Sequence, residues 1–421
     1  MFPVDKIIVN GGNRLGGEIS VHGAKNSSLP ILAATLLAEG ECVIHNCPEL
    51  TDVQAACDIL EYLGCSVKKE GNTLIVDSSV VNRWDIPEGL MHEMRSSIVF
   101  LGPILSRMRK ARLYTPGGCE IGLRPIDLHL SSLKMLGADI SESHGELICL
   151  AEKGFSGSNI TLSFPSVGAT ENIILACAIS EGTTNIFNAA REPEIADLAD
   201  FLNKCGARIT TGADGTVTVE GVRRLHGCEH TIIPDRITAA TYMSAVATAG
   251  GEVLIKDIIP MHMKPVISVF EQSGCRLDVG KSSIRVKRKE RLRPVRNVRT
   301  MPYPGFPTDA QAPVMAMTAL ADGTSVIVEN IFESRFKHVP QLVRLGSVIK
   351  IEGRVALIDG VEKLYGAKVC APDLRGGSAL VVAALAAEGT SEISGTNHID
   401  RGYEKIEESL RKIGADIRRG V

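Results

Sequence analysis

Apolar residues follow two alternating patterns along the chain. Stretches such as ILAATLLAEG (residues 31–40) and IEESLRKIG (residues 406–414) carry apolar residues at the spacing of a helix. Short β-branched runs such as TSVIVEN (residues 324–330) follow them and predict strands. We therefore expect helices and strands to alternate along the whole chain, which is typical of an α/β protein.

A short glycine-containing phrase divides the chain into six repeats. It reads LGCSV, LGADI, CGARI, SGCRL, LGSVI and IGADI, and it returns about every 70 residues. Its glycines are Gly64, Gly137, Gly206, Gly274, Gly346 and Gly414. A second phrase precedes it in five of the repeats, with glycines at Gly40, Gly182, Gly250, Gly323 and Gly389.

Each of these glycines follows an amphipathic stretch, where the end of a helix favours a residue with positive φ. We expect every repeat to contain a helix, a strand, a second helix and a strand or hairpin. A repeat of this size cannot bury a core alone, so the six should pack on one another.

The expected helix starts gather capping and charged residues. The first helices of the repeats should begin at Lys25, Arg95, Ser166, Asp235, Asp309 and Asp373. The second helices should begin at ELTDV, RPIDLH, REPEI, MHMKP, SRFKHV and DRGYE. One such start is ordinary capping. Six helix starts at equivalent positions of the repeats, with arginines among them, indicate a site for a polyanion. The reason is that helix N-termini present free N–H groups and the positive end of the helix dipole.

Composition narrows the class of protein. With 421 residues, 44% of them hydrophobic, the chain should form two or three domains. A formal charge of −3 and only 4% aromatic residues argue against a nucleic-acid or membrane-surface protein. We expect the basic run KRKERLR (residues 287–293) to be an exposed strand face or edge. We find no signal-peptide pattern and no apolar run of membrane-spanning length.

The eleven cysteines lack C-x-x-C pairs and metal-ligand spacing, which favours a reduced, cytoplasmic chain without a metal site. One of them has an unusual setting. In TPGGCEIGLRPIDLH (residues 115–129), Cys119 lies beside a glycine pair and five residues before Arg124. Mobility, access and a cationic neighbour are what a reactive thiol requires. We expect Cys119 to be reactive and the other ten cysteines to be inert core residues.

The cysteine segment and seven others in the chain closely resemble segments of the UDP-N-acetylglucosamine 1-carboxyvinyltransferase family of enolpyruvyl transferases. The resemblance covers the whole chain, in the family's order: GAKNSSLPILAATLLAEG, TPGGCEIGLRPIDLH, SVGATEN, NAAREPEI, PYPGFPTDAQA, ESRFKHVP, APDLRGG and HIDRGYE. It implies a two-domain inside-out α/β barrel of six repeats, three per domain, with the active site in the cleft between the domains. By this resemblance residues 25–234 form one domain, and residues 1–24 with 235–421 form the other.

The resemblance implies transfer of enolpyruvyl from phosphoenolpyruvate to the 3-hydroxyl of UDP-N-acetylglucosamine, with release of phosphate, as the first committed step of peptidoglycan synthesis. Addition needs one group that protonates the methylene carbon and one that accepts the hydroxyl proton. Cys119 matches the family's proton donor and Asp309 its base, while the loop glycines would let Cys119 approach after the nucleotide binds. The implied partners are the two substrates, with no cofactor.

The resemblance also implies which residues of this chain bind the two substrates, each matched to a position of the family's motifs. The expected phosphoenolpyruvate contacts are Lys25, Asn26, Arg124, Arg335, Arg375 and Arg401, of which Lys25 and Arg401 also count as catalytic. Asp373 is expected to hold the geometry of Arg335 and Arg375. The expected nucleotide-sugar contacts are Arg95, Arg124, Pro125, Ile126, Asp127, Leu128, Ser166, Val167, Gly168, Asp309 and Ile331. His129 should support the turn. Thr51 and Phe164 stand where some relatives carry lysines, so those two contacts are not carried over.

Two alternatives stay open. A 3-phosphoshikimate 1-carboxyvinyltransferase shares the repeats, but its motifs include neither the loop cysteine nor the RPIDL turn. A non-catalytic repeat scaffold would need no converging cations and no thiol. Dinucleotide and P-loop enzymes are disfavoured, because G-x-G-x-x-G and G-x-x-x-x-G-K-[ST] do not occur.

Overall fold

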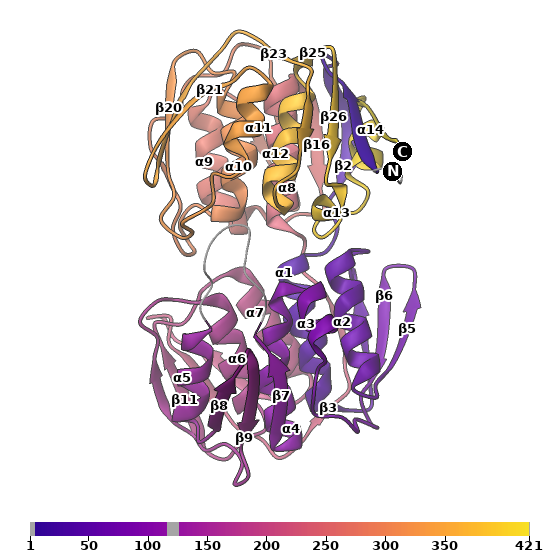
Figure 1. Cartoon of the computed structure of the whole chain (residues 1–421), viewed down its shortest axis with the longest axis vertical. Coiled ribbons are helices and arrows are strands. Elements are labelled where there is room, and N and C mark those ends of the chain that lie inside the picture. The colour runs from indigo at the N-terminus through magenta and orange to yellow at the C-terminus, as the bar shows by residue number, and fades with distance from the viewer. Residues whose placement is uncertain (1–4, 116–125, 421) are drawn as a thin grey trace. The chain divides into compact units, whose positions relative to one another are not determined.

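A computed structural model describes residues 5–115 and 126–420 of the chain, apart from the side chain of Arg95 (Figure 1). The described residues form two compact units. Unit 1 comprises residues 5–22 and 234–420, and unit 2 comprises residues 23–115 and 126–233. Among the described residues, no helix combines the length and the apolar character needed to cross a bilayer.

Unit 2 alternates helices with strands. Its helices are α1 (Lys25–Ala34), η1 (Thr35–Leu37), α2 (Thr51–Tyr62), α3 (Glu88–Glu93), η2 (Arg95–Phe100), α4 (Leu101–Met108), α5 (Asp127–Met135), α6 (Val167–Cys177) and α7 (Pro193–Lys204). Its strands are β3 (Ala38–Glu39), β4 (Glu41–His45), β5 (Ser66–Glu70), β6 (Thr73–Asp77), β7 (Lys110–Tyr114), β8 (Asp139–Ser143), β9 (Glu146–Leu150), β10 (Asn159–Thr161), β11 (Thr183–Phe187), β12 (Arg208–Thr211), β13 (Val217–Glu220), β14 (Leu225–His226) and β15 (Glu229–Thr231). The strands form sheets in the orders β15-β4-β6-β5, β10-β11-β13-β12, β7-β9-β8 and β14-β3.

Unit 1 repeats this alternation. Its helices are α8 (Arg236–Ala249), η3 (Pro260–Met263), α9 (Lys264–Gln272), η4 (Thr308–Ala310), α10 (Gln311–Thr318), α11 (Val339–Arg344), α12 (Leu374–Ala384), α13 (Thr396–Ile399) and α14 (Ile406–Lys412). Its strands are β1 (Lys6–Asn10), β2 (Leu15–Ser20), β16 (Gly251–Lys256), β17 (Arg276–Val279), β18 (Ser283–Arg288), β19 (Val298–Arg299), β20 (Thr324–Val328), β21 (Val348–Glu352), β22 (Val355–Asp359), β23 (Leu364–Tyr365), β24 (Lys368–Cys370), β25 (Ala387–Glu388), β26 (Thr390–Ser394) and β27 (Asp416–Gly420). The sheet orders are β24-β26-β1-β27, β17-β18-β16-β2, β19-β20-β22-β21 and β23-β25.

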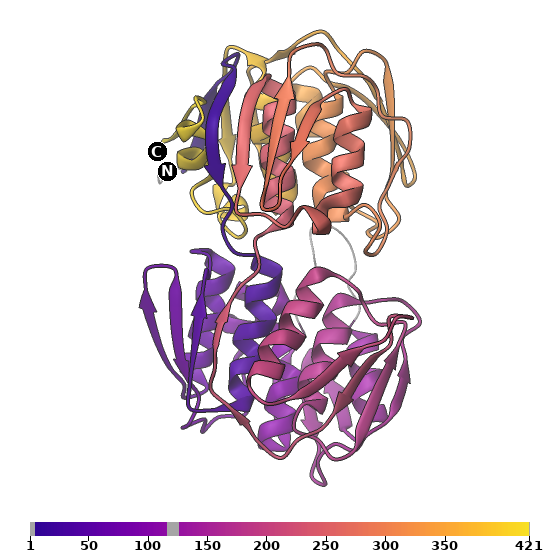
Figure 2. The same cartoon turned by 180° about the vertical axis from the view of Figure 1, so that it is seen from behind.

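Each unit has buried helices, such as α6 and α12, with strands around them, while other helices such as α5 and α9 lie on the outside, as Figure 1 and Figure 2 show from opposite sides. In unit 1, α8, α10 and α12 pack against one another, and nearly every residue of α12 is buried. A helix that is apolar all round must be covered on every side. The strands instead alternate buried with exposed positions, as β26 does, so one face of the sheet covers the helices and the other meets solvent.

The glycines of the first phrase end helices as expected, as Gly64 does after α2 and Gly414 after α14. In the second phrase the expectation fails at Gly40 and Gly389, which lie in the turns between β3 and β4 and between β25 and β26. All eleven glycines of the two phrases have positive φ, for example 103° at Gly64 and 97° at Gly414. Glycine adopts this conformation without the steric cost that a Cβ imposes. The predicted succession also holds, since α10, β20, α11 and the β21–β22 hairpin follow one another within one repeat.

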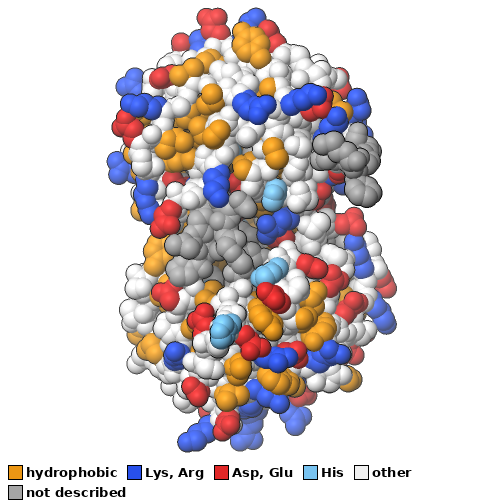
Figure 3. Space-filling view, in the orientation of Figure 1, with side chains coloured by type: hydrophobic (Ala, Val, Ile, Leu, Met, Phe, Trp, Pro, Cys, Tyr) orange, Lys and Arg blue, Asp and Glu red, His pale blue; other side chains and the backbone are white. Residues whose placement is uncertain are grey.

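The run KRKERLR was predicted to be an exposed strand face or edge, and the structure excludes the edge: its first two residues are half-buried positions of an interior strand, and most of the rest is exposed loop. Lys287 and Arg288 end β18, which lies between β17 and β16. Their cations have partners inside unit 1: Lys287 pairs with Glu252, and Arg288 donates from Nε to the carbonyl oxygen of Ala247 at 2.9 Å. Over the face in Figure 3, basic and acidic side chains are interspersed, as expected for a chain of near-neutral charge.

Candidate active site

Asp309 lies between two buried arginines of unit 1. Arg335 donates from Nη2 to Oδ1 of Asp309 at 2.7 Å, and Arg375 donates from Nη2 to Oδ2 at 3.1 Å. The side chain of Asp309 is 25% exposed, whereas each arginine side chain is 3% exposed. Because each carboxylate oxygen faces a different guanidinium, the carboxylate is fixed in orientation and reaches solvent at the edge of a cationic pair.

The start of α12 holds Arg375 in place. Asp373 caps this helix, and its Oδ1 accepts from the backbone N–H groups of Arg375 and Gly376 at 3.0 Å each. The carboxylate of Asp373 therefore acts on the backbone that carries Arg375, while Asp309 forms the ion pairs with both guanidinium groups.

Tyr403 supports the guanidinium of Arg375 from the other side. Arg375 donates from Nη1 to the Tyr403 hydroxyl at 3.1 Å, and that hydroxyl also contacts Ser378 and Thr241. Burial lowers the pKa of the Arg375 guanidinium, but the nearby Tyr403 and Asp309 raise it by more. The pKa of Arg375 therefore lies above its ordinary value. Nε of Arg375 and Nε of Arg335 are buried, and each lacks a hydrogen-bond partner among the described residues.

Glu329 connects the Asp309 segment to Ile331. This side chain, only 1% exposed, accepts from the hydroxyls of Thr300 and Thr308 at 2.9 and 3.0 Å. It also accepts from the backbone N–H of Ile331 at 2.8 Å. The segments that carry Asp309 and Ile331 are therefore held by one buried carboxylate.

Lys25 begins α1 of unit 2 and forms a buried ion pair. Its Nζ lies 2.6 Å from Oδ2 of Asp52, whose side chain is 2% exposed, in the first turn of α2. Ser27, two residues further along α1, donates its hydroxyl to Asp197. The lysine is thus held at the helix start with its charge balanced by Asp52.

The start of α6 is built around His129 and Asn172. Ser166 caps α6 by accepting from the N–H of Ala169 at 3.3 Å. Gly168 approaches the imidazole so closely that a Cβ would lie 3.0 Å from Cε1 of His129. Asn172 donates from Nδ2 to Nδ1 of His129 at 2.8 Å, and its Oδ1 accepts from the N–H of Gly102 at 2.7 Å. Burial lowers the pKa of His129 to about 4, so the imidazole is neutral at pH 7.

The predicted site residues fall into several groups. Cys119, Arg124 and Pro125 lie outside the described residues, as does the side chain of Arg95. Asp309, Arg335 and Arg375 meet directly in unit 1. Unit 1 also carries Ile331, Asp373 and Arg401, and unit 2 carries Lys25, Asn26, Ile126, Asp127, Leu128, Ser166, Val167 and Gly168.

Several residues of these constellations were not predicted: Asp52, Asn172, Glu329 and Tyr403. Only Asp52 had a local signal, as an acidic residue in the ELTDV helix start. Glu329 follows the strand run TSVIV, and no spacing rule distinguishes a buried carboxylate there from an exposed one. Within the part of the chain that the structure describes, no cluster of His, Cys, Asp and Glu side chains suits a metal ion.

Comparison with known proteins gives a consistent result. A family model described as EPSP synthase (3-phosphoshikimate 1-carboxyvinyltransferase) matches residues 9–410. The UDP-N-acetylglucosamine 1-carboxyvinyltransferase 2 of Caldanaerobacter subterraneus subsp. tengcongensis is 52% identical over 98% of this chain and 99% of its own length. The UDP-N-acetylglucosamine 1-carboxyvinyltransferase 1 of the same organism is 47% identical over 98% of this chain and 99% of its own.

Solved structures agree at the level of fold. The enolpyruvyl transferase NikO from Streptomyces tendae is similar with a TM-score of 0.89 and 27% identity, over 99% of both chains. An EPSP synthase from Acinetobacter baumannii has a TM-score of 0.75 at 18% identity, over 99% of this chain and 100% of its own.

Proposed function

Because the chain belongs to the UDP-N-acetylglucosamine 1-carboxyvinyltransferase family of enolpyruvyl transferases, we propose that it transfers enolpyruvyl from phosphoenolpyruvate to the 3-hydroxyl of UDP-N-acetylglucosamine. Phosphate is the second product, and the reaction begins peptidoglycan synthesis in the cytoplasm. The observation that carries the proposal is the 52% identity to a curated transferase over 98% of the chain.

The described geometry supports a role for Asp309. Two guanidinium groups within 3.1 Å favour the ionised carboxylate, which accepts a hydrogen bond from a substrate hydroxyl. In the proposed reaction Asp309 orients the sugar 3-hydroxyl and takes its proton as the C–O bond to phosphoenolpyruvate forms. The pair of arginines around it also supplies positive charge for an anionic substrate.

Cys119 is the proposed donor of the proton that reaches the methylene carbon. A free thiol has an ordinary pKa of about 8.5, so it is largely protonated at neutral pH and can donate. Elimination then expels phosphate and returns a proton to the thiolate, so the cysteine ends the cycle unchanged. Lys25, Asn26, Arg124 and Arg401 are proposed to bind the phosphate and carboxylate of phosphoenolpyruvate.

The uracil and diphosphate are proposed to bind unit 2. The run Arg124 to Leu128, which leads into α5, would contact uracil. Arg95 is proposed as a further contact of the nucleotide sugar. The N–H groups of Val167 and Gly168 open α6, a helix of eleven residues that starts with free donors for a diphosphate. Ile331 is proposed as a further nucleotide-sugar contact.

We also propose the finer architecture of the family for this chain: six repeats in an inside-out α/β barrel, with residues 25–234 in one domain and residues 1–24 and 235–421 in the other. In its support, β1 pairs with β26 and β27, and β2 pairs with β16. Buried helices inside exposed sheets occur in both units.

Phosphate release by the purified protein tests the proposed reaction. With phosphoenolpyruvate, release should require UDP-N-acetylglucosamine, and shikimate 3-phosphate should not replace it. The description of the matching family model favours shikimate 3-phosphate as the second candidate acceptor. Activity with that acceptor alone would replace the proposal, and no release with either would indicate a non-catalytic relative.

Labelling tests the proposed role of Cys119. A phosphonate epoxide that mimics phosphoenolpyruvate should alkylate Cys119, and Cys119→Ala should lose both the labelling and the turnover. Wild-type turnover in that variant would remove the proton-donor assignment.

A further inference from the structure

Three cysteines of unit 2 meet away from the residues discussed above. Cys42 lies on β4, Cys205 ends α7, and Cys228 directly precedes β15. The Cys205 thiol donates to Sγ of Cys228 at 3.3 Å, across 23 residues of sequence. The strand that carries Cys42, β4, pairs with β15 directly after Cys228. Sequence reasoning assigned all three to the inert core, because nothing in their spacing indicates that they touch.

The backbone around Cys205 and Cys228 is already fixed. The carbonyl oxygen of Cys228 accepts from the N–H of Val43 at 2.9 Å, and β15 pairs in parallel with β4. The carbonyl oxygen of Cys205 accepts from the N–H of His226 at 2.9 Å. The two sulfurs, 3.3 Å apart, must approach by roughly 1 Å to reach the roughly 2 Å of a disulfide.

The two thiols differ in access and in acidity. Cys228 is half-buried, whereas Cys205 is fully buried. The hydrogen bond from Cys205 lowers the pKa of the Cys228 thiol, and Lys204 lowers it further, against the effect of burial. Burial raises the pKa of Cys57, Cys149 and Cys177 to about 12. Since the thiolate is the nucleophile, Cys228 is the member of this pair that an oxidant would meet first.

We propose that Cys228 and Cys205 form a peroxide-oxidised, reversible dithiol–disulfide site. The Cys228 thiolate attacks one oxygen of hydrogen peroxide, the O–O bond breaks, and the leaving hydroxide takes a proton to become water. Cys205 then attacks the sulfenic acid at Cys228, and a second water leaves as the S–S bond forms. Two thiols lose two electrons to one peroxide. A small dithiol reverses the step by thiol–disulfide exchange.

The bond would tie the end of α7 to the segment that leads into β15. Both elements already share a buried contact, since Asp197 of α7 lies 2.9 Å from Nε2 of His230 on β15. A disulfide that closes a loop of this size restricts the unfolded chain. Unit 2 should therefore resist thermal unfolding more strongly in the oxidised enzyme.

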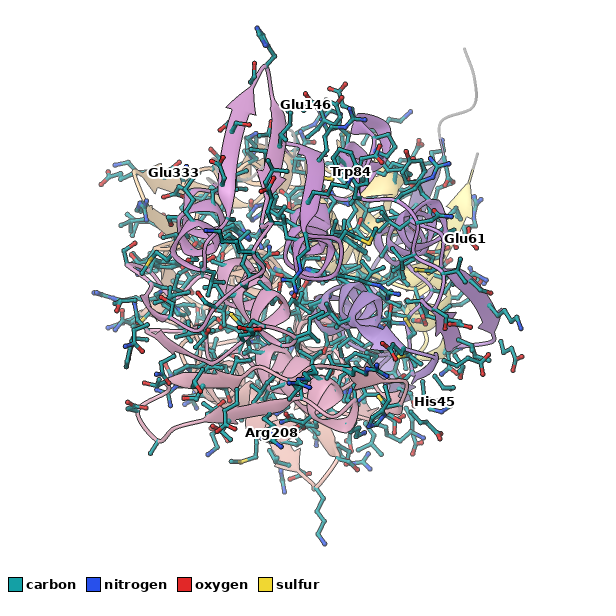
Figure 4. The ribbon with its side chains drawn as sticks, turned by 90° about the horizontal axis from the view of Figure 1, so that it is seen from below. His45, Glu61, Trp84, Glu146, Arg208 and Glu333 are labelled. Carbon is teal, nitrogen blue, oxygen red and sulfur yellow. The ribbon has the colours of Figure 1, made fainter. Side chains whose placement is uncertain are left out.

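Trypsin places the three cysteines in separate peptides, which makes the test direct. Cleavage at basic residues puts Cys205 in residues 205–208, Cys228 in residues 225–236 and Cys42 in residues 26–68. The full-length enzyme is treated with hydrogen peroxide, alkylated and digested without reduction. The expected product joins peptides 205–208 and 225–236, and treatment with a dithiol removes it. Figure 4 labels His45, on the strand β4 that carries Cys42, and Arg208, the last residue of the tryptic peptide that contains Cys205.

Variants give the matched controls. Cys205→Ser should leave Cys228 trapped as a sulfenic acid that a cyclic 1,3-dione labels, whereas Cys57→Ser should form the linked peptide as the wild type does. Peroxide should raise the Tm of the wild type by about 5–10 °C and leave that of Cys228→Ser unchanged. Linkage of peptide 205–208 to peptide 26–68 overturns the assignment of Cys228. Absence of any link to residue 205, while other thiols oxidise, overturns the site itself.

Discussion

Arg375 and Asp309 form an ion pair, with Nη2 of the arginine 3.1 Å from Oδ2 of the aspartate, although 66 residues separate them in sequence. Arg335 occupies the other oxygen at 2.7 Å. The carboxylate thus balances two buried cations and still reaches solvent. Any change at Asp309 should therefore affect both folding and turnover, and these two effects have to be measured separately.

Asp309→Asn should lower turnover by roughly 10²–10⁴-fold, because the amide cannot accept the proton of the sugar hydroxyl. It should also destabilise unit 1 by about 3–5 kcal/mol, since two buried guanidinium groups lose their counter-charge. Phosphate release and urea unfolding separate the two effects. Asp278→Asn, at an exposed strand position, is the control. A folded Asp309→Asn enzyme with wild-type turnover would show that the carboxylate is structural only.

Lys25 and Asp52 allow structure and chemistry to be separated by a double substitution. Lys25→Met should destabilise unit 2 by about 3–5 kcal/mol, because it removes the ammonium that lies 2.6 Å from the buried carboxylate of Asp52. Lys25→Met with Asp52→Leu should regain most of that stability, since both charges of the ion pair are then removed together. Turnover should stay lost in both variants. Recovery of turnover in the double variant would mean that Lys25 does not contact a substrate.

His129 predicts a loss of stability in mild acid. Its pKa is about 4 in the folded protein because it is buried, against about 6.5 when unfolded. Between these values the unfolded state binds a proton that the folded state does not. The stabilisation is therefore complete above pH 6.5 and falls by about 3 kcal/mol as the pH drops to 4.

His129→Gln should remove this contribution to the pH dependence of the free energy of unfolding. Burial also lowers the pKa of His338 to about 4, so a second contribution of the same sign should persist in unit 1. His144→Gln, at an exposed position, should follow the wild-type profile. An unchanged profile in His129→Gln would contradict the assignment.

For Glu171 on α6, we expect the opposite pH dependence: its contribution to the free energy of unfolding should fall as the pH rises. Burial, together with Glu194 and Glu192, raises its pKa well above the ordinary value. Its stabilisation is present below the unfolded pKa of about 4.5 and is lost as the pH rises through the folded value. Glu171→Gln should therefore gain stability relative to the wild type as the pH rises above about 4.5. Glu181→Gln, at an exposed position, should show no such trend in denaturant unfolding.

The helix starts show what local sequence patterns can and cannot predict. Ser166, Asp235 and Asp373 cap α6, α8 and α12 with their side chains, at the positions where the sequence predicted helices to begin. The helix predicted to begin at Asp309 instead begins at Thr308, and Asp309 inside η4 pairs with two arginines rather than capping the helix. An aspartate near a helix start can therefore have either role, and only its distant neighbours distinguish them.

The sequence by itself determined the α/β class and the positive-φ glycines, such as Gly64 and Gly414, that end helices, and its motifs identified the residues proposed for catalysis. These features depend on residues within a few turns of one another, where periodicity and capping act. The tertiary structure alone decided that Asp309 meets Arg335 and Arg375, that Lys25 pairs with Asp52, and that Cys205 touches Cys228. Those contacts join separate elements, and their distances follow from how helices and sheets pack, which no local pattern along the chain encodes.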